Sequence, residues 1–178
     1  KKSTYYLDGK QVTLSAEGLM QISYGLLELL KDVEFTGFGG MSIGADPIVG
    51  GVLVAAASQN RSMQGFMVRK EAKGHGTKRY VEGPIQPGDR VVIVDDVITD
   101  GAAKRESVEL IRAHGATPVA VLIALDRVER AAAMAGSGES LSSQSAVQAF
   151  EQEFGIPVIS IANFGDLMQF LDSDSPHA

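Results

Sequence analysis

Four consecutive apolar residues at positions 91–94, VVIV, constrain the fold more than any other feature of the chain. A strand with one face in water alternates apolar and polar residues, whereas a strand covered on both faces is apolar throughout. Residues 117–125, TPVAVLIAL, have the same character. Both runs therefore predict central strands of a mainly parallel sheet that is covered by helices on both faces.

Segments with helical spacing of apolar residues alternate with these runs. Residues 17–31, for example, place leucines and an isoleucine on one face of a helix, and Gly115 and Gly155 are expected helix stops. The expected helices are residues 17–31, 47–58, 102–114, 146–154 and 164–171. The expected strands are residues 33–38, 65–69, 91–94, 117–125 and 158–161, with Gly39 and Gly40 ending the first. This order predicts an α/β fold with a doubly wound, mainly parallel sheet flanked by helices.

Composition narrows the class of protein. The 178 residues fit one domain, and 44% apolar with 21% charged residues is ordinary for a soluble globular protein. No apolar run approaches the roughly 20 residues of a membrane helix. A formal net charge of −6 disfavours a general nucleic-acid surface, and the absence of cysteine excludes disulfides and fits a cytoplasmic protein. We expect a single domain over residues 1–178, with an N-terminal element missing before its abrupt polar start.

The residues after the first apolar run combine hydrogen-bond acceptors and donors. Asp95 and Asp96 leave the sheet at its carboxyl end, where ligands of parallel sheets bind, and their carboxylates can accept hydrogen bonds from sugar hydroxyls. Thr99 and Gly101 then open a helix, whose free N–H groups and dipole favour an anion. The alternative is a pair of polar residues that end a strand, followed by a threonine that caps a helix. Asp100 is unusual, because it adds a negative charge to a turn suited to phosphate.

A basic segment, RKEAKGHG at residues 69–76, follows another expected strand. It holds Arg69, Lys70, Lys73 and His75 together with two glycines. Cations on a flexible loop can close over a diphosphate, exclude water and neutralise charge on a departing group. From composition alone, however, a solvated charged hairpin is the preferred interpretation.

Together these motifs resemble a known family. The run VVIVDDVITDGAA at residues 91–103 resembles the 5-phosphoribosyl-1-diphosphate (PRPP) signature of type I phosphoribosyltransferases. The RKEAKGHG segment is similar to the catalytic loop of orotate phosphoribosyltransferases, and the purine enzymes of the superfamily carry different lids. Three further segments, STYY at residues 3–6, GMSIGADP at 40–47 and ALDRVER at 124–130, resemble the orotate enzymes as well. The chain is therefore identified as a member of that family, whose fold implies a small N-terminal hood.

The resemblance implies a role for each matching residue. The expected catalytic residues are Lys73, His75, Asp95 and Asp96. Those expected to bind PRPP are Arg69, Lys70, Lys73, His75, Asp95, Asp96, Val97, Ile98, Thr99, Asp100, Gly101, Ala102 and Ala103. Those expected to bind orotate are Tyr5, Tyr6, Thr99 and Arg127. The expected diphosphate turn is Gly44, Ala45 and Asp46.

Two of these assignments carry a qualification. Many family members have a lysine in the diphosphate turn where this chain has Ile43, Gly44 and Ala45, so backbone N–H groups would hold the diphosphate here. Arg127 would pair with the orotate carboxylate, because a guanidinium fork matches a carboxylate. Its alternative is a surface ion pair with Asp126 or Glu129.

The implied reaction transfers the phosphoribosyl group of PRPP to orotate, giving orotidine 5′-monophosphate and diphosphate in pyrimidine (UMP) biosynthesis. The resemblance implies Mg²⁺ bound mainly through PRPP, with Asp95 and Asp96 as possible ligands, and a homodimer whose lids reach the neighbouring active sites. The expected protein is cytoplasmic and has no nucleic-acid or membrane partner. The alternatives are a transferase for another nucleobase, such as a purine, and a PRPP-sensing regulator without catalysis, which would be expected to carry a basic nucleic-acid-binding face.

Overall fold

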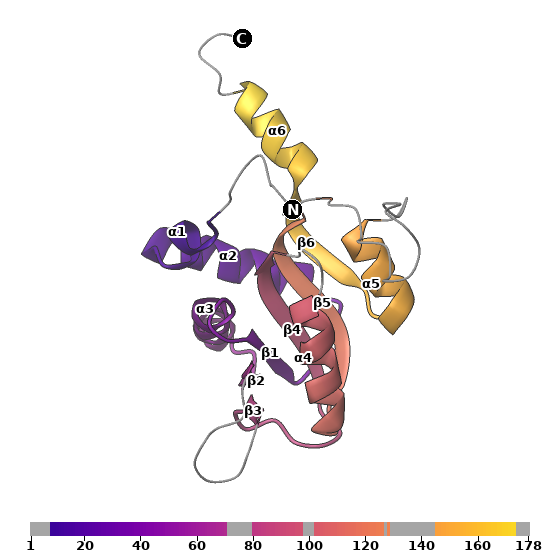
Figure 1. The fold of residues 1–178 in the computed structure, drawn as a ribbon. Helices are drawn as coiled ribbons and strands as arrows, with labels where there is room; N and C mark the ends of the chain where they lie inside the picture. The colour runs from indigo at the N-terminus through magenta and orange to yellow at the C-terminus, as the bar shows by residue number, and fades with distance from the viewer. Residues whose placement is uncertain (1–7, 71–79, 98–101, 127, 129–144, 174–178) are drawn as a thin grey trace, which may run out of the picture.

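The structure is a computed structural model that describes residues 8–70, 80–97, 102–126, 128 and 145–173 (Figure 1). Within these residues, six strands form one sheet in the order β3-β2-β1-β4-β5-β6. The strands are β1 (Gly37–Met41), β2 (Gln64–Val68), β3 (Val81–Glu82), β4 (Arg90–Val97), β5 (Thr117–Asp126) and β6 (Val158–Asn163). The helices are α1 (Lys10–Thr13), α2 (Ala16–Leu29), α3 (Asp46–Ser58), α4 (Ala102–Ala113), α5 (Ala146–Phe154) and α6 (Phe164–Ser173). Only the β2–β3 pair is antiparallel in the described sheet, which confirms the predicted α/β architecture.

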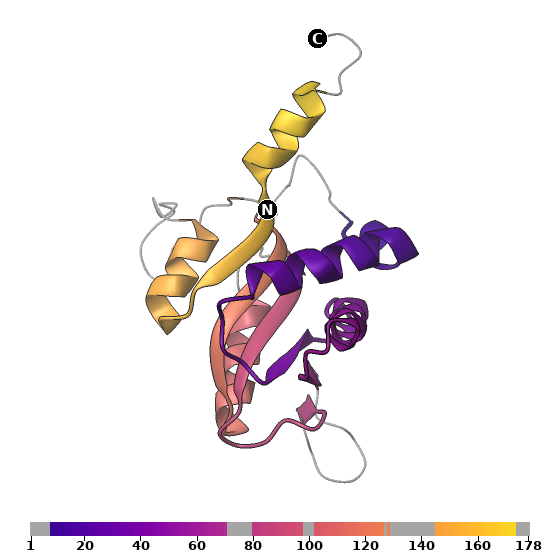
Figure 2. The same cartoon turned by 180° about the vertical axis from the view of Figure 1, so that it is seen from behind.

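Both faces of the sheet are buried, as the apolar strands require. Val92 and Val94 of β4 pack in a cluster with α2 and α3. Val91 and Ile93 point to the opposite face and pack in a second cluster with α4 and α5. Figure 1 shows the two helical layers on either side of the sheet, and Figure 2 shows α2 and α3 together from behind. A fully buried aliphatic side chain contributes about 1.5–3 kcal/mol to folding, so β4 is a main source of stability.

The first strand lies later in the chain than predicted. The expectation was a strand at residues 33–38 that Gly39 and Gly40 end, whereas both glycines lie inside β1. A Cβ atom at Gly39 would overlap the carbonyl oxygen of Phe66 in β2, and one at Gly40 would overlap that of Val94 in β4. These glycines are therefore required by the close approach of neighbouring backbone on both sides of β1.

The remaining predicted elements are present, with small shifts at their ends. The bounds of α5 match the prediction because its ends have strong signals. Ser145 accepts a hydrogen bond from the N–H of Gln148, whose side chain in turn accepts from the N–H of Ser145, and Gly155 ends the helix with a φ of 66°. Helix α1 and strand β3 were not predicted from the sequence, because both are too short to show a periodic pattern.

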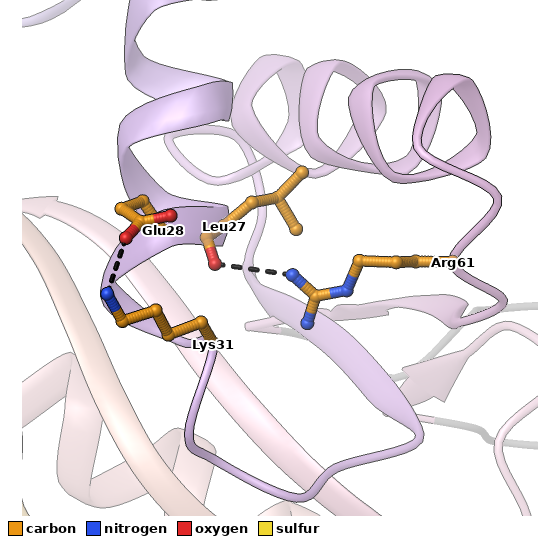
Figure 3. A network of polar contacts seen from close by, with 4 residues as sticks. All are labelled: Leu27, Glu28, Lys31 and Arg61. Carbon is orange, nitrogen blue, oxygen red and sulfur yellow. Dashed lines mark hydrogen bonds and ion pairs between the residues drawn. The ribbon is translucent and has the colours of Figure 1, made fainter.

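A small polar network secures the end of α2 (Figure 3). The guanidinium Nη1 of Arg61 donates to the carbonyl oxygen of Leu27 at 3.3 Å, which provides a partner for a carbonyl in the last turn of the helix. Lys31 Nζ lies 2.6 Å from Glu28 Oε1, and both side chains are mostly exposed. The hydrogen bond and the charge of Glu28 raise the pKa of Lys31 above its ordinary value.

The last helix, α6, extends away from the sheet in both views (Figures 1 and 2). Asn163 caps it, since its side-chain oxygen accepts hydrogen bonds from the N–H groups of Gly165 and Asp166 at 2.7 and 3.1 Å. None of the described helices is long and apolar enough to cross a lipid bilayer.

Candidate active site

The topology of the sheet locates a candidate ligand site. Among the described strands, β1, β2, β4, β5 and β6 run parallel, so their carboxyl ends lie at one edge. The chain moves outward from β1 to β2 on one side and from β4 to β5 and β6 on the other, which places the switch point between β1 and β4. Doubly wound sheets bind ligands at the carboxyl edge beside such a point. The segments after β1 and β4 therefore flank the expected crevice.

The paired aspartates lie where the sequence analysis predicted them. Asp95, Asp96 and Val97 are the last residues of β4, and α4 begins at Ala102 and continues through Ala103. The strand and the helix on either side of the predicted phosphate turn are thus both present. Of the residues predicted to bind PRPP in this loop, Ile98, Thr99, Asp100 and Gly101 lie outside the described residues.

Asp95 forms an ion pair that the sequence analysis missed. Its Oδ2 atom lies 2.6 Å from Nζ of Lys104 in the first turn of α4, and the two side chains are only 14% and 6% exposed. A signal for this pair was present in the sequence. Lys104, Val108 and Ile111 have the spacing of residues on one face of a helix, so Lys104 belongs to a buried, otherwise apolar stripe. A cation that is buried there needs an anionic partner.

The predicted diphosphate turn lies between β1 and α3. The N–H of Ala45 donates to the carbonyl oxygen of Met41 at 3.2 Å, Ala45 is fully buried, and α3 begins at Asp46. Among the described residues, the buried Oδ1 atom of Asp46 has no hydrogen-bond partner. Gly44, Ala45 and Asp46 therefore approach the same edge as Asp95, from the strand next to β4.

The start of the predicted lid follows β2 at this edge. Arg69 and Lys70 are exposed, and the N–H of Arg69 donates to the carbonyl oxygen of Tyr80 at 2.8 Å, just before β3 begins. Nη1 of Arg69 lies 3.8 Å from Oε1 of Glu82, which is a charge pair too long for a hydrogen bond. Lys73 and His75, the predicted catalytic residues of the lid, lie outside the described residues.

The residues predicted to bind orotate, Tyr5, Tyr6 and Arg127, also lie outside the described residues, as does Thr99. The chain on either side of Arg127 is described. Asp126 is the last residue of β5, and its Oδ1 atom accepts a hydrogen bond from the N–H of Val128 at 2.8 Å. Val128 has a φ of 51°, in the left-handed region. The chain therefore turns at the carboxyl end of β5, at the same edge of the sheet as Asp95.

Comparison with known proteins identifies the family. No protein-family model matches the chain. The orotate phosphoribosyltransferase of Rhodopirellula baltica is 41% identical over 160 residues, which cover 86% of this chain and 83% of that protein. The chain belongs to the orotate phosphoribosyltransferase family. The predicted family and the predicted enzyme class, a pentosyltransferase, are confirmed, while the roles of individual residues stay predictions.

Solved structures confirm the type I phosphoribosyltransferase fold. The orotate phosphoribosyltransferase of Mycobacterium tuberculosis H37Rv in complex with Fe(III) dicitrate is 29% identical with a TM-score of 0.76, covering 94% of this chain and 85% of its own. The same enzyme in complex with PRPP is 27% identical with a TM-score of 0.72, covering 92% and 83%. The adenine phosphoribosyltransferase of Thermoanaerobacter pseudethanolicus is 15% identical with a TM-score of 0.62, covering 92% and 91%, so it shares the fold alone. The fold by itself therefore does not select the nucleobase.

Proposed function

We propose that this protein transfers the 5-phosphoribosyl group from PRPP to orotate, forming orotidine 5′-monophosphate and releasing diphosphate. The observation that carries the proposal is the position of Asp95 and Asp96 at the end of β4, beside the switch point, in a chain of this family. In the reaction, the bond from the anomeric carbon to the diphosphate oxygen breaks, and a bond from that carbon to a ring nitrogen of orotate forms. No protein nucleophile is needed.

In this proposal three segments at the carboxyl edge of the sheet each bind one part of PRPP. Asp95 and Asp96 accept hydrogen bonds from the ribose hydroxyls, and residues 99–103 hold the 5-phosphate at the start of α4. The turn at residues 44–46 holds the diphosphate through backbone N–H groups, although those of Ala45 and Asp46 donate to the carbonyl oxygens of Met41 and Ile43 in this structure. Helix N-termini suit both anionic groups, because their N–H groups lack partners within the helix and the dipole is positive there.

The lid and the base-binding residues complete the proposed site. Lys70 contacts the diphosphate in its own subunit, and Arg69, Lys73 and His75 close over it from the neighbouring subunit. These cations stabilise the charge that develops on the leaving group. Arg127 pairs with the orotate carboxylate, beside Tyr5, Tyr6 and Thr99.

The proposal includes Mg²⁺ as the metal cofactor. A hard cation prefers oxygen ligands and is often held by one or two carboxylates together with substrate phosphates. The Asp95 carboxylate fits that chemistry. In the described part of the chain, no group of three or more His, Cys, Asp or Glu gathers into a metal site, and a metal held mainly by PRPP does not require one. When bound, Mg²⁺ would neutralise negative charge on PRPP.

The proposed assembly and location follow the family resemblance. We propose a homodimer, because the lid is assigned to the neighbouring subunit's site. We also propose that the single-domain protein works in the cytoplasm without nucleic-acid or membrane partners, which agrees with its lack of cysteine and its net charge of −6.

An assay of base specificity tests the proposal. The protein is mixed with PRPP, Mg²⁺ and one candidate base at a time, and the loss of the base is followed by its ultraviolet absorbance. Orotate is expected to disappear only when PRPP is present, with stoichiometric release of diphosphate. Consumption of adenine, guanine or uracil in its place would identify a different transferase, and PRPP binding without turnover of any base would identify a sensor.

A further inference from the structure

The ion pair between Lys104 and Asp95 joins the two ends of the proposed PRPP loop. Asp95 directly precedes residues 96–103, and Lys104 directly follows them. We propose that Lys104 is a positioning residue, which holds the Asp95 carboxylate and the start of α4 in the arrangement that binds PRPP. The inference rests on the proposed function, and it concerns a residue outside the motif that identifies the family.

Burial makes this contact more than a surface ion pair. The Lys104 and Asp95 side chains are 6% and 14% exposed, whereas those of Lys31 and Glu28, at the same distance of 2.6 Å, are 60% and 71% exposed. Exposed pairs are screened by water and constrain their side chains little. A buried charge that loses its partner is costly, so the buried pair holds both residues in place.

The position of the pair gives it a role in binding. The Asp95 carboxylate has about four acceptor positions, and Lys104 uses one of them on Oδ2. This contact constrains the orientation of the carboxylate, on which the proposed hydrogen bond from a ribose hydroxyl depends. The same contact fixes the first turn of α4 relative to the end of β4, which sets the separation between the proposed ribose and phosphate positions.

The charge of Lys104 also matters for an anionic ligand. Residues 95–104, DDVITDGAAK, contain three aspartates and a single basic residue. PRPP carries several negative charges, and its approach to the Asp95 carboxylate is opposed by repulsion. A cation bound to Asp95 offsets part of this repulsion at short range, where the surroundings are buried and screening is weak.

Calorimetric titration with PRPP and Mg²⁺ tests the proposal. It compares the wild type with Lys104→Met, Asp95→Asn and the double variant. Lys104→Met is expected to weaken PRPP binding about tenfold or more, since displaced binding groups commonly cost one to two orders of magnitude. If Lys104 acts through Asp95, the double variant binds PRPP no more weakly than the weaker single variant. Lys31→Met, the matched exposed lysine, is expected to bind as the wild type does.

A kinetic measurement separates positioning from a general structural defect. The KM for PRPP is expected to rise in Lys104→Met while the KM for orotate stays unchanged, and a partly unfolded enzyme would lose active fraction with both KM values retained. Wild-type PRPP affinity in Lys104→Met would overturn the proposal. Additive losses in the double variant would overturn it too, because they would mean that Lys104 acts independently of Asp95.

If Lys104→Met does not fold, Lys104→Arg and the double variant decide the question. Retention of the charge in Lys104→Arg is expected to keep PRPP affinity within about threefold of the wild type, and a tenfold loss would contradict the proposal. The binding readout needs no orotate. A wild type that binds PRPP without consuming orotate would therefore refute the proposed function while the Lys104 measurement still stands.

Discussion

The hydroxyl of Thr36 donates a hydrogen bond to Oδ1 of Asp89 at 2.8 Å, which ties the residue before β1 to the residue before β4. The other oxygen of Asp89 accepts from the N–H of Gln86 at 2.6 Å. Asp89 therefore fixes the two central strands at their amino ends, opposite the edge where we place the active site.

Asp89→Ala is expected to lower the free energy of unfolding by about 1–3 kcal/mol, because the hydrogen bonds from the Thr36 hydroxyl and the Gln86 N–H lose their acceptor. Urea denaturation measures this change. PRPP affinity is expected to remain at the wild-type value, since the site lies at the other edge of the sheet. Thr36→Val is the milder companion variant, and a PRPP affinity that fell in Asp89→Ala would argue against this separation of the two edges.

Two glycine variants test the close packing of β1. Gly40→Ala places a Cβ against the carbonyl oxygen of Val94 and the side chain of Ala45, so it is expected to destabilise the protein by about 1–3 kcal/mol or more. Gly50→Ala, in α3, meets no atom within 4 Å and is expected to stabilise by about 0.5–1 kcal/mol. Thermal and urea unfolding compare the two. Equal effects would mean that β1 does not approach its neighbours as described.

Loss of both carboxylates at the end of β4 tests the ribose assignment. Asp95→Asn/Asp96→Asn is expected to weaken PRPP binding by about tenfold or more, because charged hydrogen bonds each contribute about 1.5–3 kcal/mol. Asp32→Asn, at an exposed position after α2, serves as the control. Unchanged PRPP affinity in the double variant, measured by calorimetry, would remove these residues from the site.

Arg127→Ala tests base recognition separately from PRPP binding. Orotate binding is expected to fall by about tenfold or more, because a charged hydrogen-bonding pair with the orotate carboxylate is lost. PRPP binding is expected to be retained. Arg61→Ala, which removes the arginine that donates to the Leu27 carbonyl in α2, is the control and should leave both affinities unchanged. A surface ion pair at Arg127 would instead give wild-type kinetics.

Lys73→Ala is expected to abolish most orotate turnover by removing charge stabilisation from the leaving diphosphate. If lids are shared between subunits, mixing this inactive variant with inactive Asp95→Asn/Asp96→Asn restores activity. Random exchange would give about a quarter of the wild-type rate, since half of the dimers are mixed and each has one intact site. Steady-state assay of the mixture measures this, and no recovery would exclude a shared site.

The sequence predicted most of the sheet because the buried strands have an unmistakable composition. Residues 91–94 and 118–125 are apolar throughout and lie in β4 and β5, with both faces covered. Strong end signals placed α5 equally well. The prediction failed at β1, where Gly39 and Gly40 read as a turn. Only the positions of Phe66 and Val94, which lie far away in the chain, reveal why a strand needs glycine there.

Only the part of the candidate site that a local motif encodes was predicted from the sequence. A local motif identified Asp95 and Asp96, since strand, carboxylates and helix follow one another directly. Lys104 lies just beyond the motif and was missed, because its pairing with Asp95 depends on burial of one face of α4 rather than on a recognised pattern. Ion pairs of this kind can be found from sequence only when a charged residue is noticed within an apolar stripe.

Pairing of β1 with β4 also sets an order of events during synthesis. The chain delivers β1, α3 and β2 well before β4, yet β4 is the neighbour that completes the central pair. Until Arg90–Val97 leaves the ribosome, β1 presents one unpaired edge, and an open edge is a template for association with other chains. The unpaired edge of β1 is therefore a place where a nascent chain can associate with others until translation supplies a strand from the middle of the sequence.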